Sequence, residues 1–226
     1  MSPAVDPLRV ALERRFRTEV TPIEAGPYEL QVLHPANADD LIREEDYVRD
    51  ERLPYWADLW PSSHALAAEV ATMRGRGKRF LELGCGAGVV TTMAALRGFA
   101  VVATDYYDDA LDFAAANAWY NASVRIATRN VDWRDFPDDI GQFDVVVASD
   151  VLYEAEYVPL IASAIARTLS PRGFAVIADP GRVAAVLLPD ACKANGLRVQ
   201  TARRVPFESG EIRQTIDLLE VRRVPA

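Results

Sequence analysis

From Phe80 onward, short apolar runs alternate with longer amphipathic segments. Runs that are apolar on both faces are typical of strands buried in a parallel sheet. The expected strands are Phe80–Leu83, Phe99–Thr104, Val124–Ala127, Phe143–Ser149 and Phe174–Ala178, and the expected helices are Val89–Arg97, Asp109–Tyr120, Tyr157–Leu169 and Val183–Asn195. Repeated strand–helix units predict an α/β fold with a doubly wound, Rossmann-like sheet.

The two ends of the chain follow other patterns. At the C-terminal end, residues 197–205 and 212–221 are strand-like runs joined by a turn segment that ends at Gly210. This hairpin signal predicts a seven-stranded sheet that is mostly parallel and closes with an antiparallel C-terminal strand. Residues 1–60 are less regular. We expect a short helix at Leu8–Phe16 and a strand at Tyr28–Leu33.

A charged stretch, Asp39–Glu51, is expected to form the solvated face of a helix. Because the regular alternation begins later, we divide the chain into two parts. Residues 1–60 are predicted to be an N-terminal extension that covers substrate and cofactor as a lid. Residues 61–226 are predicted to be the main domain, which carries the chemistry.

Composition narrows the possible partners. The net charge of -8, from 33 acids and 25 bases, disfavours non-specific nucleic-acid binding and suits a cationic partner. No apolar stretch approaches the ~20 residues that a membrane span needs. Cys85 and Cys192 lie far apart with no Cys-x-x-Cys, so neither a disulfide framework nor a zinc site is expected. We expect a cytoplasmic monomer or weak dimer with no metal, nucleic-acid or membrane partner.

The clearest chemical signal lies directly after the first strand of the alternating region. Gly84, Gly86 and Gly88 follow it at alternate positions and precede a predicted helix. A strand, a glycine-rich turn and a helix N-terminus together bind nucleotide-like ligands through backbone N–H groups and the positive end of the helix dipole. A dinucleotide fold needs Gly-x-Gly-x-x-Gly, which would place the third glycine at Val89. A dehydrogenase is therefore disfavoured.

The Gly-x-Gly-x-Gly form, preceded by Glu82, resembles the S-adenosylmethionine (AdoMet) loop of class I seven-strand methyltransferases. Asp105 ends the next predicted strand, where a carboxylate can accept hydrogen bonds from both ribose hydroxyls. The resemblance implies that Asp132 faces the adenine amino group and that Trp133 offers its backbone N–H to the ring. It therefore implies AdoMet as the cofactor and its demethylated product as the leaving species.

AdoMet has a carboxylate that suits the N–H groups of the loop, and an ammonium that suits Glu82 or the loop carbonyls. The aromatic face of Trp60 would shield the cationic sulfonium. The predicted cofactor-binding residues are Trp60, Glu82, Gly84, Cys85, Gly86, Gly88, Asp105, Tyr106, Asp132, Trp133 and Ser149.

Three segments narrow the resemblance. Pro54–Pro61 resembles the entry segment of the electron-transfer-flavoprotein β-subunit lysine methyltransferases, and Asp179–Arg182 matches an Asp-Pro-Gly-Arg element of that branch. Asp150–Tyr153 resembles the Asp-x-x-Tyr element of the wider family of seven-strand protein-lysine methyltransferases. The resemblance covers roughly residues 50–185 and implies a protein substrate that presents a lysine.

The resemblance also implies roles at the acceptor side. Asp150 is expected to hold the lysine ammonium in line with the methyl group, and Tyr153 to line the lysine channel. The predicted catalytic residues are therefore Asp150 and Tyr153, and the predicted substrate-binding residues are Tyr55, Trp56, Asp179 and Arg182. Arg182 would grip an acidic group of the substrate protein, and Asp179 a lysine.

Two other functions stay open at this stage. One is a methyltransferase acting on a small-molecule amine or other metabolite, and the other is an AdoMet-binding regulatory module without turnover. Substrate choice is often decided outside the shared segments, and residues 1–50 and 186–226 match little. The identity of the methyl acceptor therefore does not follow from the sequence.

Overall fold

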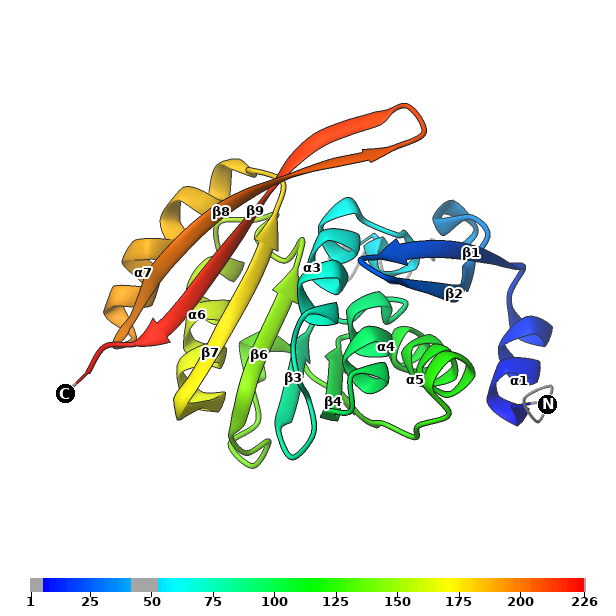
Figure 1. Ribbon diagram of the computed structural model, residues 1–226, viewed down its shortest axis with the longest axis horizontal. Helices are drawn as coiled ribbons and strands as arrows, with labels where there is room; N and C mark the ends of the chain where they lie inside the picture. Colours follow the sequence, from blue (N-terminus) through cyan, green and yellow to red (C-terminus); the bar gives the residue numbers. More distant parts are fainter. Residues whose placement is uncertain (1–5, 42–52, 226) are drawn as a thin grey trace.

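A computed structural model describes residues 6–41 and 53–225. Its centre is a seven-stranded sheet (Figure 1). In spatial order the strands are β5 (Ala127–Asn130), β4 (Ala100–Asp105), β3 (Arg79–Leu83), β6 (Phe143–Ser149), β7 (Leu169–Asp179), β9 (Ile212–Arg223) and β8 (Leu197–Ser209). The first five are parallel, and β9 runs antiparallel to both β7 and β8. The predicted doubly wound sheet with an antiparallel C-terminal hairpin is therefore confirmed.

Helices cover both faces of this sheet (Figure 1). They are α3 (Pro61–Ala71), α4 (Val89–Leu96) and α5 (Asp108–Ala122) on one face and α6 (Tyr157–Thr168) and α7 (Leu188–Ala194) on the other. Side chains of β3 alternate between the two faces. Phe80 joins the buried cluster that contains Met93 of α4, whereas Leu81 joins the one that contains Ile161 of α6. This two-sided burial explains why the strands read as continuous apolar runs.

The strand order reverses between β3 and β6. From β3 the chain continues outward to β4 and β5, and from β6 it continues in the opposite direction to β7. In an open α/β sheet, ligands bind in the crevice beyond the carboxyl ends of the strands at such a switch point. The residues that end or follow these two strands, Gly84 and Ser149, therefore border the expected ligand site.

The N-terminal extension is more regular than the sequence indicates. It contains α1 (Pro7–Arg15) and an antiparallel pair, β1 (Thr18–Ala25) and β2 (Tyr28–Pro35), followed by the short turns η1 (Ala38–Leu41) and η2 (Tyr55–Ala57). The helix and β2 were predicted, but β1 was not, because only two of its eight residues are buried and the strand gives no apolar pattern. The predicted helix face over Asp39–Glu51 lies mostly outside the described residues.

The hairpin of β1 and β2 packs on the main domain. Ile23 and Leu30 belong to the same buried cluster as α3 and α4. The side chain of Asn117 on α5 accepts a hydrogen bond from the N–H of Leu33 and donates one to its carbonyl, both at 2.8 Å. These contacts fix the hairpin beside α5.

Two predicted elements differ from the structure. The strand expected at Val124–Ala127 lies at Ala127–Asn130, because β5 is an edge strand with mostly exposed, polar side chains. The helix expected over Val183–Asn195 is divided into a 3-10 segment, η4 (Val183–Leu187), and α7. Pro189 lies in the first turn of α7, where a missing N–H is tolerated. Over residues 6–41 and 53–225, no helix is long and apolar enough to span a bilayer.

Candidate functional site

The glycine-rich loop joins β3 to α4 in a geometry that excludes larger residues. Gly88 is the N-cap of α4 at φ 82°, and a Cβ there would lie 2.5 Å from Cα of Ala114 on α5. A Cβ at Gly84 would lie 3.2 Å from the Trp133 ring. The loop therefore brings α4 against α5 and leaves its own backbone accessible beneath Trp133. Both features need glycine.

Asp105 at the end of β4 holds this loop. Its carboxylate accepts hydrogen bonds from the N–H of Gly86 at 2.9 Å and of Tyr107 at 3.1 Å. The residue is only 7% exposed. Burial raises the pKa of the carboxyl, because the charged form loses water, and the two N–H groups oppose that shift. Asp105 thus links the loop to the segment after β4 and lines the cavity between them.

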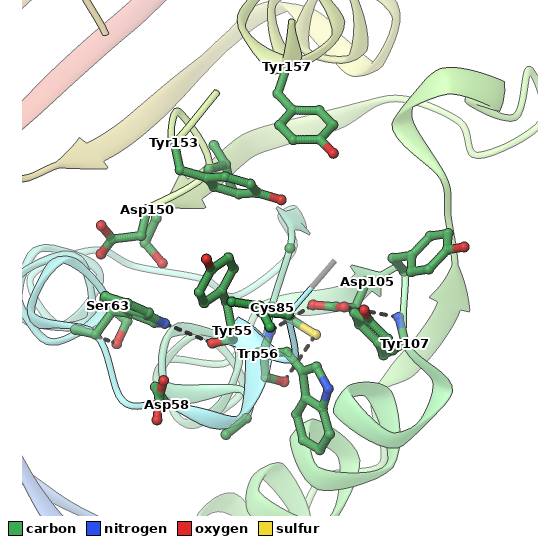
Figure 2. Close-up of a pocket in the computed structure, with 18 of the residues that line it drawn as sticks. Tyr55, Trp56, Asp58, Ser63, Cys85, Asp105, Tyr107, Asp150, Tyr153 and Tyr157 are labelled. Atoms are coloured by element: carbon green, nitrogen blue, oxygen red, sulfur yellow. Dashed lines mark hydrogen bonds between the residues drawn. The ribbon is translucent and has the colours of Figure 1, made fainter. Parts of the chain in front are cut away.

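The cavity has a volume of about 480 Å³ and opens beyond the carboxyl ends of β3, β4 and β6 (Figure 2). This volume falls within the ~300–1,000 Å³ of small-molecule and cofactor sites. Its described wall carries five carboxylates and one guanidinium: Asp58, Asp105, Asp132, Asp150, Glu154 and Arg182. The excess of negative charge favours a cationic ligand.

Trp133 and Asp132 form one end of the cavity. Asp132 caps the turn η3 (Trp133–Asp135), and its carboxylate pairs with Arg134 at 2.6 Å. The Trp133 ring makes an edge contact with Tyr157, with ring centroids 5.6 Å apart. A flat apolar ring above a glycine backbone, with a carboxylate beside it, is a suitable surface for a nucleobase.

Aromatic side chains continue the wall from Tyr157 to Trp60. Tyr55 lies 6.1 Å from Trp60 and 5.9 Å from Tyr153 between ring centroids, and Tyr153 lies 5.1 Å from Tyr157. Figure 2 shows Tyr55 and Tyr153 facing the same space from two different loops. Tyr55 is 44% exposed and Tyr153 is 36% exposed, so both lie at the mouth. The wall thus joins the segment before α3 to the loop after β6.

Asp150 follows β6 in an unusual conformation. Its φ is 57°, in the left-handed region that non-glycine residues rarely adopt, and it is 9% exposed. Oδ1 accepts hydrogen bonds from Arg182 Nη2 at 2.9 Å and Nε at 3.3 Å. Oδ2 is buried and has no hydrogen-bond partner. Strain of this kind clusters at functional sites, and the free oxygen lies on a residue of the cavity wall.

Arg182 is held in place from two sides. Its guanidinium lies 5.6 Å from the centroid of the Trp60 ring. Its backbone N–H donates to Asp179 Oδ1 at 2.7 Å, and the N–H of Gly181 donates to the same oxygen at 2.8 Å. Burial raises the pKa of Asp179. Asp179 therefore fixes the turn that carries Arg182.

Most of the predicted site residues meet in this cavity. Those that line it are Tyr55, Trp56, Trp60, Gly84, Cys85, Gly86, Asp105, Tyr106, Asp132, Trp133, Ser149, Asp150, Tyr153 and Arg182. Glu82, Gly88 and Asp179 are outside its wall. The carboxyl of Glu82 is buried against Thr91 Oγ1 at 2.5 Å, and burial raises its pKa to about 8.

Two predicted residues have a mainly packing environment. Trp56 is 9% exposed and packs on Phe113 with centroids 5.7 Å apart. Burial raises the pKa of the Cys85 thiol well above its ordinary value, so a neutral, unreactive side chain fills the loop. The described residues contain no cluster of three histidine, cysteine or acidic side chains that could hold a metal ion.

Four charged or aromatic wall residues were not predicted: Asp58, Tyr107, Glu154 and Tyr157. Tyr157 was predicted as the first residue of a helix, and it does begin α6. Its position four residues after Tyr153 is the signal that could have placed it in the aromatic wall. Asp58 stands inside the tryptophan-rich segment that was already assigned to the site.

Comparison with known proteins agrees with this geometry. A family model described as a methyltransferase domain matches residues 81–177. The electron transfer flavoprotein beta subunit lysine methyltransferase of Xenopus laevis is 31% identical over 57% of this chain and 53% of its own length. The EEF1A lysine methyltransferase 3 of Mus musculus is 29% identical over 58% of each chain. The chain spans little more than half the length of these curated relatives.

A solved structure supports the fold. The magnesium protoporphyrin IX methyltransferase of Synechocystis PCC 6803, solved with bound AdoMet, covers 82% of this chain and 97% of its own, with a TM-score of 0.57 and 17% identity. At that identity the likeness concerns the fold alone. The chain therefore has the class I methyltransferase fold and resembles the protein-lysine methyltransferases, in particular the electron-transfer-flavoprotein β-subunit branch.

Proposed function

We propose that this protein is an AdoMet-dependent methyltransferase that methylates a lysine side chain of a protein substrate. The observation that carries the proposal is one acidic, aromatic-walled cavity that joins the glycine loop to a buried carboxylate with a free oxygen, Asp150 Oδ2. The relatives named as lysine methyltransferases support the same choice. The free, buried cysteines Cys85 and Cys192 suit a reducing cytoplasm, where we expect a monomer or weak dimer.

The cavity fits the parts of AdoMet. The start of α4 at Val89 offers N–H groups and a positive dipole end to the carboxylate of the methionine part. The N–H groups of Gly84, Cys85, Gly86 and Gly88 are already hydrogen-bonded within the protein. We assign to Asp105 the hydrogen bonds from the ribose hydroxyls, and to Asp132 and Trp133 the adenine, because all three residues line the cavity. When bound, AdoMet supplies an electrophilic methyl group on a cationic sulfur. The acidic wall favours that positive charge.

The acceptor side fits a lysine. Tyr55 and Tyr153 form an apolar slot at the mouth for the methylene chain. Asp150 lies deeper and offers Oδ2 to the amine. These residues orient the amine nitrogen so that its lone pair meets the methyl carbon. The acceptor ammonium loses one proton to water before it attacks. A bound AdoMet would supply the methyl group, and the electron pair of its C–S bond would stay on sulfur.

Positioning accounts for most of the expected rate enhancement. A free lysine has a pKa near 10.4, so deprotonation at pH 7 costs about 4–5 kcal/mol. Transfer into the aromatic slot lowers that cost by desolvating the ammonium. No histidine of the described residues lines the cavity, so a strong general base is not part of the proposal. Holding the reacting atoms in line is the remaining contribution.

Labelling tests the proposal and separates it from the small-molecule alternative. The purified protein is incubated with methyl-labelled AdoMet and a cell extract, and the labelled material is separated by mass. Label on a polypeptide, localised to lysine by mass spectrometry and absent without the protein, is the expected result. Label confined to low-mass material would contradict the proposed acceptor. AdoMet binding without any transfer would indicate a regulatory module.

A further inference from the structure

The ion pair between Asp150 and Arg182 raises a question about the lysine site. A lone carboxylate beside the acceptor would favour the ammonium form of lysine, which cannot attack. In the structure one oxygen of that carboxylate is already engaged. Arg182 donates to Oδ1 from Nη2 at 2.9 Å and from Nε at 3.3 Å. The remaining oxygen, Oδ2, is buried and without a hydrogen-bond partner.

We infer that Arg182 is a positioning residue that offsets the charge of Asp150, so that Oδ2 holds the acceptor amine without keeping it protonated. This inference rests on the proposed function. It assigns the two oxygens different tasks: Oδ1 is bound by a permanent cation of the protein, and Oδ2 accepts one N–H from the substrate. Arginine suits this task because its guanidinium stays charged throughout the working pH range.

The surroundings of Arg182 agree with a fixed role. The guanidinium lies over the Trp60 ring at 5.6 Å, and the Asp179 turn fixes its backbone. Asp150 itself is held by its own N–H, which donates to the carbonyl of Ala178 at 3.0 Å. Both members of the pair are therefore anchored to neighbouring strand ends, β6 and β7. A side chain fixed from both directions is poorly suited to swing out toward a substrate carboxylate.

Other charged groups near the pair do not replace Arg182. Asp179, from the end of β7, interacts with the charges of both Asp150 and Arg182. Tyr153 and Glu154 come from the same loop as Asp150, and Tyr55 and Asp58 come from the segment before α3. All the carboxylates among them favour a protonated amine. Arg182 is the sole cation in the described wall, so its removal leaves only carboxylates, which favour the protonated form of the acceptor amine.

Removal of the Arg182 charge should change the pH dependence of the methylation rate. In Arg182→Gln, the acceptor amine loses a neighbouring positive charge and holds its proton more tightly. The acidic limb of kcat at saturating acceptor, which reports the pKa of the amine in the bound complex, should move to higher pH by about one to two units, the size expected for removing a unit charge beside Asp150. At pH 7 the rate should fall about tenfold or more and recover as the pH rises. Arg182→Lys keeps the charge and should retain most of the wild-type profile.

The acceptor for these assays is the polypeptide labelled by the wild-type protein in the extract experiment. Asp150→Asn provides a second measurement if Arg182→Gln does not fold, because loss of the anion should move the same limb to lower pH. A rate in Arg182→Gln that falls equally at every pH would overturn the inference, as would a rate equal to or above that of the wild type at pH 7. If the wild-type protein labels no amine at all, the proposed function fails instead.

Discussion

Replacing Gly88 by alanine tests the close approach of α4 and α5 that shapes the cofactor loop. Two costs are expected. The φ of 82° places an alanine in the left-handed region, at about 1–2 kcal/mol. Its Cβ would also lie 2.5 Å and 2.6 Å from Cα and Cβ of Ala114, so the helices must separate. Overpacking of this kind costs about 1–3 kcal/mol. We expect a total loss of about 2–5 kcal/mol in the free energy of unfolding.

Gly77→Ala is the matched control. Its φ is 78°, and no atom lies within 4 Å of a Cβ built there, so it carries the backbone cost alone. The loss of unfolded-state entropy on replacing glycine is similar in both variants and cancels. Urea denaturation followed by tryptophan fluorescence measures both. For a chain of this size each kcal/mol corresponds to about 2–4 °C in Tm. Equal destabilisation by the two substitutions would refute the argument from close packing.

Three further predictions concern the carboxylates and the aromatic wall. Burial raises the pKa of Glu82 from 4.5 to about 8. As pH rises between those values, the unfolded chain releases the proton and the folded chain keeps it, so the wild type should lose up to about 5 kcal/mol of stability. Glu82→Gln should flatten this dependence in urea titrations, and equal slopes would contradict the burial argument. Asp105→Ala leaves the N–H of Gly86 unpaired and should weaken AdoMet binding at least about tenfold, as measured by calorimetry. If the variant binds AdoMet with wild-type affinity, Asp105 has no role in cofactor binding. Tyr55→Ala should raise KM for a protein acceptor with little change in Tm, because Tyr55 is an exposed residue of the proposed acceptor slot. Tyr120 is similarly exposed, and Tyr120→Ala should change neither KM nor Tm. Equal KM values for the two variants would count against an acceptor slot.

The sheet was predictable because the apolar pattern of its strands is local in the sequence and is repeated from strand to strand. Strands buried on both faces must be apolar throughout, so β3 and β6 are evident from composition alone. The same reasoning fails at edges. In the edge strand β5, Thr128 and Asn130 are exposed and Arg129 is half-buried, and β1 buries few side chains. Their pairing depends on neighbouring strands, which a one-dimensional pattern does not contain.

The candidate site was predictable to the extent that its residues follow strand ends. The parallel topology brings the carboxyl ends of β3, β4 and β6 together, and with them Gly84, Asp105 and Ser149, whichever side chains stand at these positions. The orientation of side chains was not predictable. The sequence indicated Arg182 as a grip for a substrate acid, but in the structure its guanidinium pairs with Asp150. That pairing depends on the turn held by Asp179, which only the three-dimensional arrangement reveals.

We propose that one cavity holds AdoMet and presents its methyl group to a lysine. The most direct test is mass spectrometry of a purified acceptor after incubation with AdoMet, and the electron transfer flavoprotein β subunit is the first acceptor to try because a relative of that name matches this chain. We expect methyl groups on a lysine ε-nitrogen with the wild-type protein, and none with Asp150→Ala, although that variant still binds AdoMet. Methylation by Asp150→Ala at the wild-type rate would contradict it.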